Sequence, residues 1–590
     1  MLKNAINGRA LAIFLATPIL TACLSSGGGG GGGSSDDEGS SSTLVPTEPN
    51  LSLTPQSIKT FAFGWDDVGS ETEYRLLENA DGASGYTPIA SIPSGTTSHE
   101  LEVFLPERIN ASYILEACNS EGCSDSAEVF VDTNLADAVG YVKAFNTGDD
   151  DKFGTSVALA ADGKTLAVGA AEEGSSSTGI DGADNDDALR SGAVYVFNHD
   201  GSSWSQQAYV KASNTTTQDM FGRSVALAAD GNTLAVGAHR ENSGATSING
   251  DQNNSDAFNS GAVYVFSRSG TSWSQQAYVK GSNSRGGDEF GRSVALAADG
   301  NTLAVGAHLD DRIANSSGAA YVFVRSGTTW SEQAYLKAST VTAADLFGLR
   351  VALDATGDTL AVGAIRDDSG ATGVNGDEDN RDARNSGAVY VFSRSGTSWS
   401  QQAFVKASNT AEEARFGRGV ALADDGNTLA VGAQGEGWIN TSNLGTGAAY
   451  VFVRSGTTWS EQAYLKASNP GANDRFGFSV ALTGDGDTLA VGAYLENSNA
   501  TGIGGAQNDN SALNSGAVYL FSRSGTSWNQ QAHVKASNAE ESDNFGFSVA
   551  LAAGGNILAV GAHTEDSNAT GVDGNQADNS APNSGAVYLY

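Results

Sequence analysis

A segment that recurs seven times constrains this chain more than any other feature. Its clearest copy runs from Phe221 to Ala238 as FGRSVALAADGNTLAVGA, and each copy opens with a Phe-Gly pair. The pairs begin at Phe153, Phe221, Phe290, Phe347, Phe416, Phe476 and Phe545. Recurrence at a nearly constant spacing is typical of repeat proteins, in which each unit is one supersecondary element that packs against its neighbours.

Each repeat unit predicts four antiparallel strands. In the second unit, Val225 and Leu227 alternate with small residues, as do Leu234 and Val236, which is the period of a half-buried strand. Asp230-Gly231 between them is a hairpin signal, because glycine tolerates positive φ. A third strand is expected over 261–266 and a fourth over 273–280. Four-stranded units repeated radially form a β-propeller, so the predicted fold is all-β with a seven-bladed propeller.

The strand count predicts how the ring of blades closes. Only six units carry a fourth strand that begins with tryptophan, and the chain stops at Tyr590, one strand short. The missing strand lies at the other end, where 140–144 (GYVKA) matches 209–212 (YVKA). We therefore expect residues 139–146 to pair with the last strand, which would remove an exposed sheet edge.

The Phe-Gly opening and the Gly-Ala ending of the second strand resemble the FG-GAP repeat of the integrin α-chain propeller over residues 139–590. The chain departs from that family in two ways. The proline that follows Gly-Ala is absent, and a tight turn such as Asp230-Gly231 replaces the calcium-binding DxDxDG loop between the first two strands. The resemblance implies a seven-bladed propeller with a role in adhesion, but its calcium sites do not transfer to these turns.

Residues 1–23 have the pattern of a secretory signal. Lys3 and Arg9 precede a short apolar run that ends in Leu20-Thr21-Ala22-Cys23. This ending resembles the bacterial lipoprotein cleavage box, which implies that Cys23 is lipidated. Because Leu24 follows rather than aspartate, the resemblance favours the outer membrane. The alternative is an ordinary signal peptide with an incidental cysteine.

Two further segments precede the repeats. Residues 24–50 contain seven consecutive glycines and then serine and acidic residues, which predicts a flexible linker. Residues 51–133 resemble a fibronectin type III sandwich, with Trp65 and Tyr113 as its core aromatic residues. Cys118 and Cys123 flank its last turn, so an exported protein would join them in a disulfide. A metal pair is the alternative.

The composition excludes some partners. Acidic residues outnumber basic ones 68 to 32, for a net charge of −36. This balance argues against nucleic acid or an anionic membrane as a partner, since both repel a negative surface. The membrane would be reached only through the lipid anchor, and we expect a monomer.

Aspartate precedes the Phe-Gly phenylalanine by two residues in six of the seven units. One interpretation is a ring of cation ligands. The other is an Asx turn in which each carboxylate caps backbone N–H groups, and the separation of the blades favours it. The residues are Asp151, Asp219, Asp288, Asp345, Asp474 and Asp543.

The loops between the second and third strands carry a run of aspartate, asparagine and glutamine in five units. Oxygen ligands of this kind suit calcium, although the carboxylates do not recur at a fixed spacing, and solvated Asx turns explain the pattern as well. The candidate calcium ligands are Asp181, Asp184, Asp186, Asp251, Asn254, Asp377, Asp379, Asn380, Asp509, Asp573 and Asp578. Calcium is the one cofactor that the sequence suggests.

The predicted topology places these long acidic loops on one side of the propeller. Loops on a rigid scaffold are a usual place for recognition. We therefore expect a surface-tethered lipoprotein that binds a protein or glycan through its propeller loops. No catalytic motif is present, so we expect no enzyme. The alternatives are an envelope hydrolase with its site at the propeller axis and an envelope assembly or scaffold factor.

Overall fold

The computed structural model describes residues 44–438 and 445–590, which are almost entirely β-strand and loop. Residues 45–590 form one compact unit. The predicted signal peptide, Cys23 and residues 24–43 of the predicted linker lie outside the described residues. No helix in the described ranges is long and apolar enough to cross a membrane. The two helices there are short 3-10 turns, η1 (Leu105–Glu107) and η2 (Ala136–Ala138).

Two antiparallel sheets precede the repeats. The first consists of three strands, β1 (Ser52–Gln56), β2 (Thr60–Gly64) and β5 (Ser98–Glu102). The second consists of β3 (Glu73–Asn79), β4 (Thr87–Pro93), β6 (Ser112–Asn119), β7 (Gly122–Asp125) and β8 (Val129–Phe130). Aromatic side chains fill the core of this region: Trp65 packs on Tyr74, and Phe63 on Tyr113.

The repeats form a β-propeller of four-stranded antiparallel sheets, of which the described residues contain seven. In each sheet the first strand is innermost. The first strands are β10 (Phe153–Leu159), β14 (Phe221–Leu227), β18 (Ser293–Leu296), β22 (Phe347–Leu353), β26 (Phe416–Leu422), β30 (Ser479–Leu482) and β34 (Ser548–Leu551). The second strands are β11 (Thr165–Ala170), β15 (Thr233–Ala238), β19 (Thr302–Ala307), β23 (Thr359–Ala364), β27 (Thr428–Ala433), β31 (Thr488–Ala493) and β35 (Leu558–Ala562).

The outer two strands of each sheet follow the same order. The third strands are β12 (Ala193–His199), β16 (Ala262–Ser269), β20 (Ala319–Ser326), β24 (Ala388–Ser395), β28 (Ala448–Ser455), β32 (Ala517–Ser524) and β36 (Ala586–Leu589). The fourth strands are β13 (Trp204–Val210), β17 (Ser272–Val279), β21 (Thr329–Leu336), β25 (Ser398–Val405), β29 (Thr458–Leu465), β33 (Ser527–Val534) and β9 (Gly140–Val142).

Close contact between neighbouring sheets explains the small residues of the repeat. Every residue of β15 is buried, because a sheet packs on each of its faces. A Cβ at Gly237 would lie 2.0 Å from the carbonyl oxygen of Gly291 in the next sheet, so only glycine fits there. Gly291 itself has φ +89°, a conformation that favours glycine. The Phe-Gly and Gly-Ala pairs are therefore the contact points between sheets.

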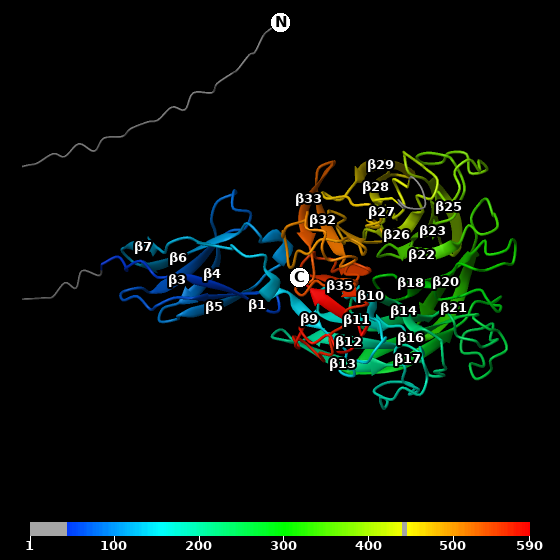
Figure 1. The fold of residues 1–590 in the computed structure, drawn as a ribbon, viewed down its shortest axis with the longest axis horizontal. Coiled ribbons are helices and arrows are strands. Elements are labelled where there is room, and N and C mark those ends of the chain that lie inside the picture. Colours follow the sequence, from blue (N-terminus) through cyan, green and yellow to red (C-terminus); the bar gives the residue numbers. More distant parts are fainter. Residues whose placement is uncertain (1–43, 439–444) are drawn as a thin grey trace, which may run out of the picture. The chain divides into compact units, whose positions relative to one another are not determined.

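The first strands pack on one another around the propeller, and β34 of the last sheet packs on β10 of the first. Figure 1 shows the sheets following one another in chain order until the red end of the chain meets the cyan beginning of the repeats. The last sheet has the order β34-β35-β36-β9. In it Tyr141 pairs with Tyr588 and Val142 with Val587, which is the pairing that the strand count predicts.

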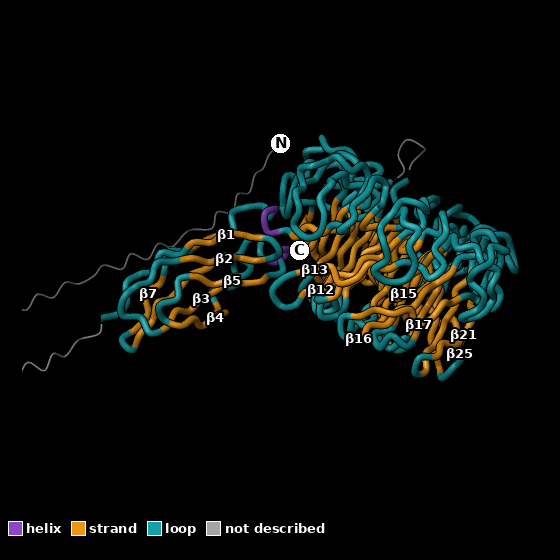
Figure 2. Tube along the Cα trace, turned by 90° about the horizontal axis from the view of Figure 1, so that it is seen from below, coloured by secondary structure: helices purple, strands orange, loops and turns teal. Residues whose placement is uncertain are grey.

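The propeller has two different faces. The first strands begin, and the second strands end, on the face that carries the long loops between second and third strands; we call it the loop face. These loops are prominent along one side of the propeller in Figure 2. Short turns occupy the opposite face, where Arg268 stacks over Trp273 and Arg394 pairs with Asp358. The arginines of that face are thus held by aromatic and acidic neighbours.

Candidate functional site

The loop face is the candidate functional site, because it carries the longest irregular segments of the described chain. In the first sheet the loop between second and third strands covers 171–192, and in the fourth it covers 365–387. The third sheet has a much shorter loop, 308–318, between strands of the same sequence pattern. The scaffold is thus constant, and the loops are where the units differ.

Two of the asparagine and aspartate positions in these loops fasten the loop to itself. The Asn254 side-chain oxygen accepts hydrogen bonds from the backbone N–H groups of Gly244, at 2.7 Å, and Asp256. Asn380 does the same for Gly370 and Asp382. These candidate ligands already use their oxygens to satisfy backbone donors, as Asx turns do.

Several of the candidate carboxylates have the same local role. Each accepts a hydrogen bond from the backbone N–H two residues ahead: Asp251 from Asn253, Asp377 from Asp379, Asp509 from Ser511 and Asp578 from Ser580. Two others tie their loop to the fourth strand. Asp181 accepts from the N–H of Tyr209, and Asp573 from that of Tyr141.

The remaining candidates reach toward neighbouring segments. Asp184 accepts a hydrogen bond from the Asn146 amide at 2.9 Å, and Asp379 one from the Thr340 hydroxyl at 3.4 Å. Asp186 lies beside Gly174 within its own loop. In the described ranges, no three acidic side chains of these loops bring ligand oxygens together within reach of one ion.

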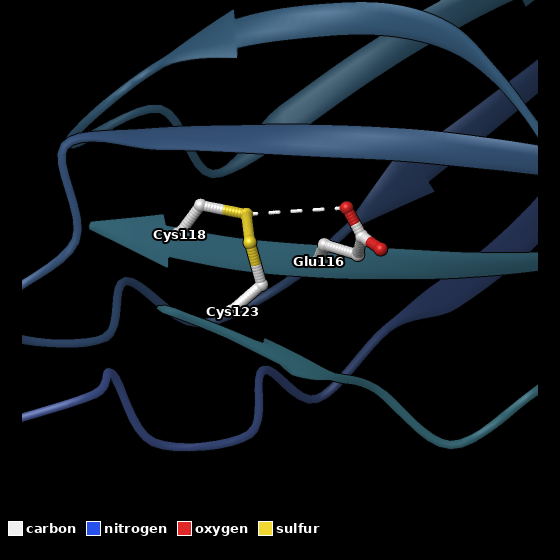
Figure 3. A group of neighbouring side chains, drawn as sticks. All are labelled: Glu116, Cys118 and Cys123. Atoms are coloured by element: carbon white, nitrogen blue, oxygen red, sulfur yellow. Dashed lines mark hydrogen bonds between the residues drawn. A yellow bond between two sulfur atoms is a disulfide. The ribbon is translucent and has the colours of Figure 1, made fainter. Parts of the chain in front are cut away.

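In the described chain, one group of three side chains does bring possible ligand atoms this close together, and it lies in the region before the repeats. It consists of Glu116, Cys118 and Cys123 (Figure 3). The two sulfur atoms are bonded to each other in a disulfide across the β6–β7 turn. Because a disulfide sulfur is not a thiolate, this group does not offer the ligands of a metal site.

Sequence reasoning missed a lysine and an acidic residue that pair in every repeat unit. The lysine follows the fourth strand, and the acidic residue comes three positions after the Gly-Ala pair. Their recurrence at fixed positions was the available signal. The pairs have N–O distances of 2.6–3.2 Å and are Lys143–Glu565, Lys211–Glu173, Lys280–Glu241, Lys337–Asp310, Lys406–Asp367, Lys466–Glu436 and Lys535–Glu496.

These pairs attach the start of each long loop to the residue that follows the fourth strand. Lys211 and Glu173 are buried, and Lys211 Nζ also donates to the hydroxyl of Ser191 at 2.8 Å. Burial lowers the pKa of Lys211, and the adjacent Glu173 carboxylate opposes that change. Removing one partner of such a pair leaves an uncompensated buried charge. The pair therefore fixes the position of the residues where the loop begins.

The aspartates that precede the Phe-Gly pairs are buried caps of a turn. Asp219 accepts hydrogen bonds from the backbone N–H of Thr216, at 2.8 Å, and from its hydroxyl. The other five accept an N–H from the third residue before them in the same way. Burial raises the pKa of Asp219 to about 7 and that of Asp543 to about 8. The geometry is that of the Asx-type cap that the sequence favoured over a ring of cation ligands.

Three histidines recur directly after the Gly-Ala pair, and they are neutral. Burial, and then nearby arginines, lower the pKa of His308 to about 3 and that of His239 well below its ordinary value. Burial also lowers the pKa of His563 to about 3.

Comparison with known proteins gives one family. Six stretches match the FG-GAP repeat: 204–266, 273–323, 330–392, 399–452, 459–521 and 528–590. No curated protein matches the chain.

Among solved structures, the chain is similar to the WD40 repeats of RRP9, with 10% identity over 76% of this chain and 96% of that one and a TM-score of 0.41. It is also similar to a periplasmic gluconolactonase of Pseudomonas aeruginosa, with 15% identity over 64% and 86% and a TM-score of 0.39. An oligogalacturonate lyase of Vibrio parahaemolyticus matches with 9% identity over 76% and 92% and a TM-score of 0.38.

Proposed function

The chain belongs to the FG-GAP repeat family, and from that premise we propose that it is a non-catalytic binding module that engages a protein or glycan at the bacterial cell surface. The observation that carries the proposal is the loop face. The long loops gather on one side of a scaffold whose sheets are locked by buried ion pairs and glycine contacts. Variable loops on a rigid frame are the usual basis of recognition.

The proposal includes a closed seven-bladed ring. Its support is the packing of β34 on β10 and the pairing of β36 with β9, which leave no edge strand between last and first sheets. A closed ring holds all loops of one face at fixed positions, so a ligand can contact several of them at once. Ordering several flexible loops at the moment of binding would otherwise cost affinity.

The region before the repeats is proposed to be a fibronectin type III-like spacer. The strand sets β1-β2-β5 and β4-β3-β6-β7 and the buried Trp65 and Tyr113 support this assignment. One feature departs from the type, because the Tyr113 hydroxyl donates to the Glu78 side chain rather than to a backbone carbonyl.

A lipidated Cys23 and the glycine-rich linker are proposed to tether the chain to the outer membrane as a monomer. The support is the sequence Leu20-Thr21-Ala22-Cys23, with Leu24 after it. Near the end of the predicted linker the Pro46 carbonyl accepts a hydrogen bond from Ser124. Calcium is proposed as an accessory ligand of the acidic loops, and nucleic acid is not a partner of a chain with net charge −36.

The direct test uses the full chain with Cys23→Ser, immobilised and exposed to purified envelope proteins and surface glycans, with calcium or with a chelator. We expect saturable retention of a ligand without chemical change to it. Turnover of a ligand, shown by mass spectrometry before and after exposure, would contradict a non-catalytic role. Equal retention in calcium and chelator would restrict the proposal to calcium-independent binding.

A further inference from the structure

Four arginines converge at the axis of this acidic protein. Arg223, Arg292, Arg350 and Arg418 come from the first strands of four consecutive sheets or from the residue directly before the strand. Arg223, Arg292 and Arg350 line a cavity of about 180 Å³ where the first strands begin, which is the loop-face end of the propeller axis. Arg418 contacts the ring of Phe478, which also lines this cavity. The cavity at the other end of the axis is lined by leucine, alanine, glycine and two aspartates, and by no arginine.

These guanidinium groups lack acidic partners. In the described part of the chain, none of the four forms an ion pair within 4.0 Å. Nη1 of Arg292 and Nη1 of Arg418 are buried and have no hydrogen-bond partner, and Arg418 is only 8% exposed. Arg350 donates to the Leu349 carbonyl at 3.1 Å. Buried donors of a charged group are normally satisfied, so the unsatisfied donor of Arg292 at the cavity calls for an acceptor, and Arg418 next to the lining residue Phe478 has a second unsatisfied donor.

The arginines also act on one another. Burial, followed by repulsion from Arg292 and Arg223, lowers the pKa of Arg418 to about 9. The pKa of Arg350 is lowered well below its ordinary value by burial and then by Arg418 and Arg292. An anion between these groups would relieve the repulsion.

Two carboxylates offset the cluster in part. Burial and the other arginines lower the pKa of Arg223, whereas the negative charges of Glu172 and Glu289 act to raise it. Glu289 lies 3.6 Å from His308, whose pKa is lowered to about 3 and which is therefore neutral. Four guanidinium groups thus face two nearby carboxylates, and positive charge remains in excess.

An aromatic wall holds two of the arginines in place. The Cζ atom of Arg418 lies 3.8 Å from the ring centre of Phe478, and that of Arg223 lies 5.8 Å from that of Phe547. Phe547 in turn stacks on His563. A guanidinium that lies on a ring keeps its N–H groups free at its edges, the geometry in which arginine grips an oxyanion with two hydrogen bonds.

The repeats differ at this position and little elsewhere in the strand. The residue after Phe-Gly is Thr155, Arg223, Arg292, Leu349, Arg418, Phe478 or Phe547, and in the fourth unit arginine follows one position later. A uniform repeat would give a ring of one residue type. This chain instead places arginines on one side of the axis and phenylalanines on the other.

We propose that the loop-face end of the axis is a binding site for one small oxyanion group, the carboxylate, sulfate or phosphate of a ligand, held by Arg223, Arg292 and Arg350, with Arg418 adding positive charge beside them. The inference deepens the proposed function, on which it rests, because it names the group that a surface ligand would insert. The volume admits a single substituent rather than a polymer segment. The excess positive charge at the axis would attract the anionic group locally, against the repulsion of the surrounding acidic loops.

The test measures anion binding by the full chain with Cys23→Ser. Melting temperature is followed against sodium sulfate, phosphate and acetate, each compared with sodium chloride at equal ionic strength. Trifluoroacetate observed by fluorine NMR gives a direct binding signal. We expect at least one of the three anions to raise the melting temperature above the chloride control, and the strongest of them identifies the chemical source of the oxyanion.

The decisive variant is Arg223→Gln with Arg292→Gln, and Arg454→Gln is its matched control. Arg454 stacks on Trp459 on the opposite face, so the control removes the same side-chain type without touching the axis. The double variant should bind the anion about tenfold more weakly or worse, because two charged donors are lost. If the double variant does not fold, Arg292→Lys replaces it. Lysine keeps the positive charge but cannot donate two parallel hydrogen bonds to one oxyanion, so affinity for the anion should still fall.

Two results would overturn the inference. One is an equal anion shift in wild type, the axial variant and the Arg454→Gln control. The other is the absence of any shift beyond chloride in the wild type. If the arginines are needed for the anion shift but the immobilised chain retains no protein or glycan, the anion site stands and the proposed binding function is refuted. If the axial variant retains a ligand as strongly as the wild type does, the binding function stands and the anion site is refuted.

Discussion

The hydroxyl of Ser548, in the last sheet, donates a hydrogen bond of 2.7 Å to the carbonyl of Gly154, in the first sheet. The same bond joins earlier neighbours: Ser156 to Gly222, Ser224 to Gly291 and Ser479 to Gly546. The contact between the two ends of the repeat array is therefore made by the same chemistry as the contacts within it.

Replacing Ser548 by alanine should remove this closing bond. The Gly154 carbonyl would lose its hydroxyl donor, and we expect the free energy of unfolding to fall by about 1 kcal/mol, the usual net value of one hydrogen bond. Chemical denaturation measures the change. Ser479→Ala removes the equivalent bond inside the array and is the matched control. A closed ring predicts similar losses, whereas no loss for Ser548→Ala beside a clear loss for Ser479→Ala would show that the last and first sheets are not held together.

The N-terminal strand should be essential to the last sheet. Lys143, just after β9, donates to Glu565 at 3.0 Å, and both side chains are buried. Lys143→Met leaves Glu565 as a buried, unpaired charge, so a loss of about 3–5 kcal/mol is expected. Adding Glu565→Gln should recover much of it. The outcome that would contradict this account is a double variant as unstable as the single one, measured by urea denaturation.

The buried aspartates predict an unusual dependence of stability on pH. Burial raises the pKa of Asp543 to about 8 and that of Asp151, Asp219, Asp345 and Asp474 to about 7. A raised folded-state pKa means that the folded chain holds these protons more tightly than the unfolded chain. Their contribution is complete below the unfolded pKa of about 4 and is lost progressively as pH rises from there to the folded values. Above about pH 6.5, where histidine is neutral in both states, the aspartates act alone, so stability should fall until about pH 8.

Below this window the buried histidines act in the opposite direction. The pKa of His308 and of His563 is lowered to about 3, so the unfolded state gains protons there first as pH falls through the ordinary histidine range. Asp543→Asn isolates the aspartate effect. Relative to wild type, this variant should gain up to about 2 kcal/mol between about pH 6.5 and 8.5. A difference that is constant with pH would mean that Asp543 titrates normally.

Calcium should raise the melting temperature more than sodium at equal ionic strength if the acidic loops bind it, because a ligand of the folded state alone stabilises it. Asp377→Ala with Asp379→Ala should reduce that shift. The control removes two exposed aspartates of the opposite face, Asp230→Ala with Asp299→Ala, each of which caps a turn. Equal shifts in calcium and sodium would leave these loops as solvated turns.

Much of the fold was predictable from repetition. The alternation over 223–227 and 234–238 marks β14 and β15, and the FG-GAP resemblance is confirmed by the family match. The strand at 139–146 could be found by counting, since its partner is another copy of the same unit. Repetition identifies the pairing of neighbouring strands, because the same strands pair in the same order in every unit.

The pairings across a unit were less accessible. Every repeat has a lysine at the position of Lys211 and an acidic residue at the position of Glu173. Their separation in sequence gives no sign that they meet, and only the folded sheet brings Lys211 and Glu173 to 2.6 Å. The arginines at the axis were harder still. Arg223 and Arg350 occupy different positions of their repeats and converge only through the packing of the first strands around the axis. Such convergence depends on tertiary geometry that no single unit contains.

Ligand binding by the loop face can be tested by exchanging loops within the chain. Residues 365–387 of the fourth unit are replaced by 308–318 of the third, which connect strands of the same pattern, and far-UV circular dichroism checks the fold.

Beads that carry the full chain with Cys23→Ser are then measured for retention on cell surfaces and purified surface glycans. We expect retention to fall about tenfold or more after the exchange, as when contacts at the centre of an interface are lost. Asp230→Ala with Asp299→Ala should leave retention unchanged. Undiminished retention after the loop exchange, together with loss in the opposite-face control, would contradict ligand binding by the loop face.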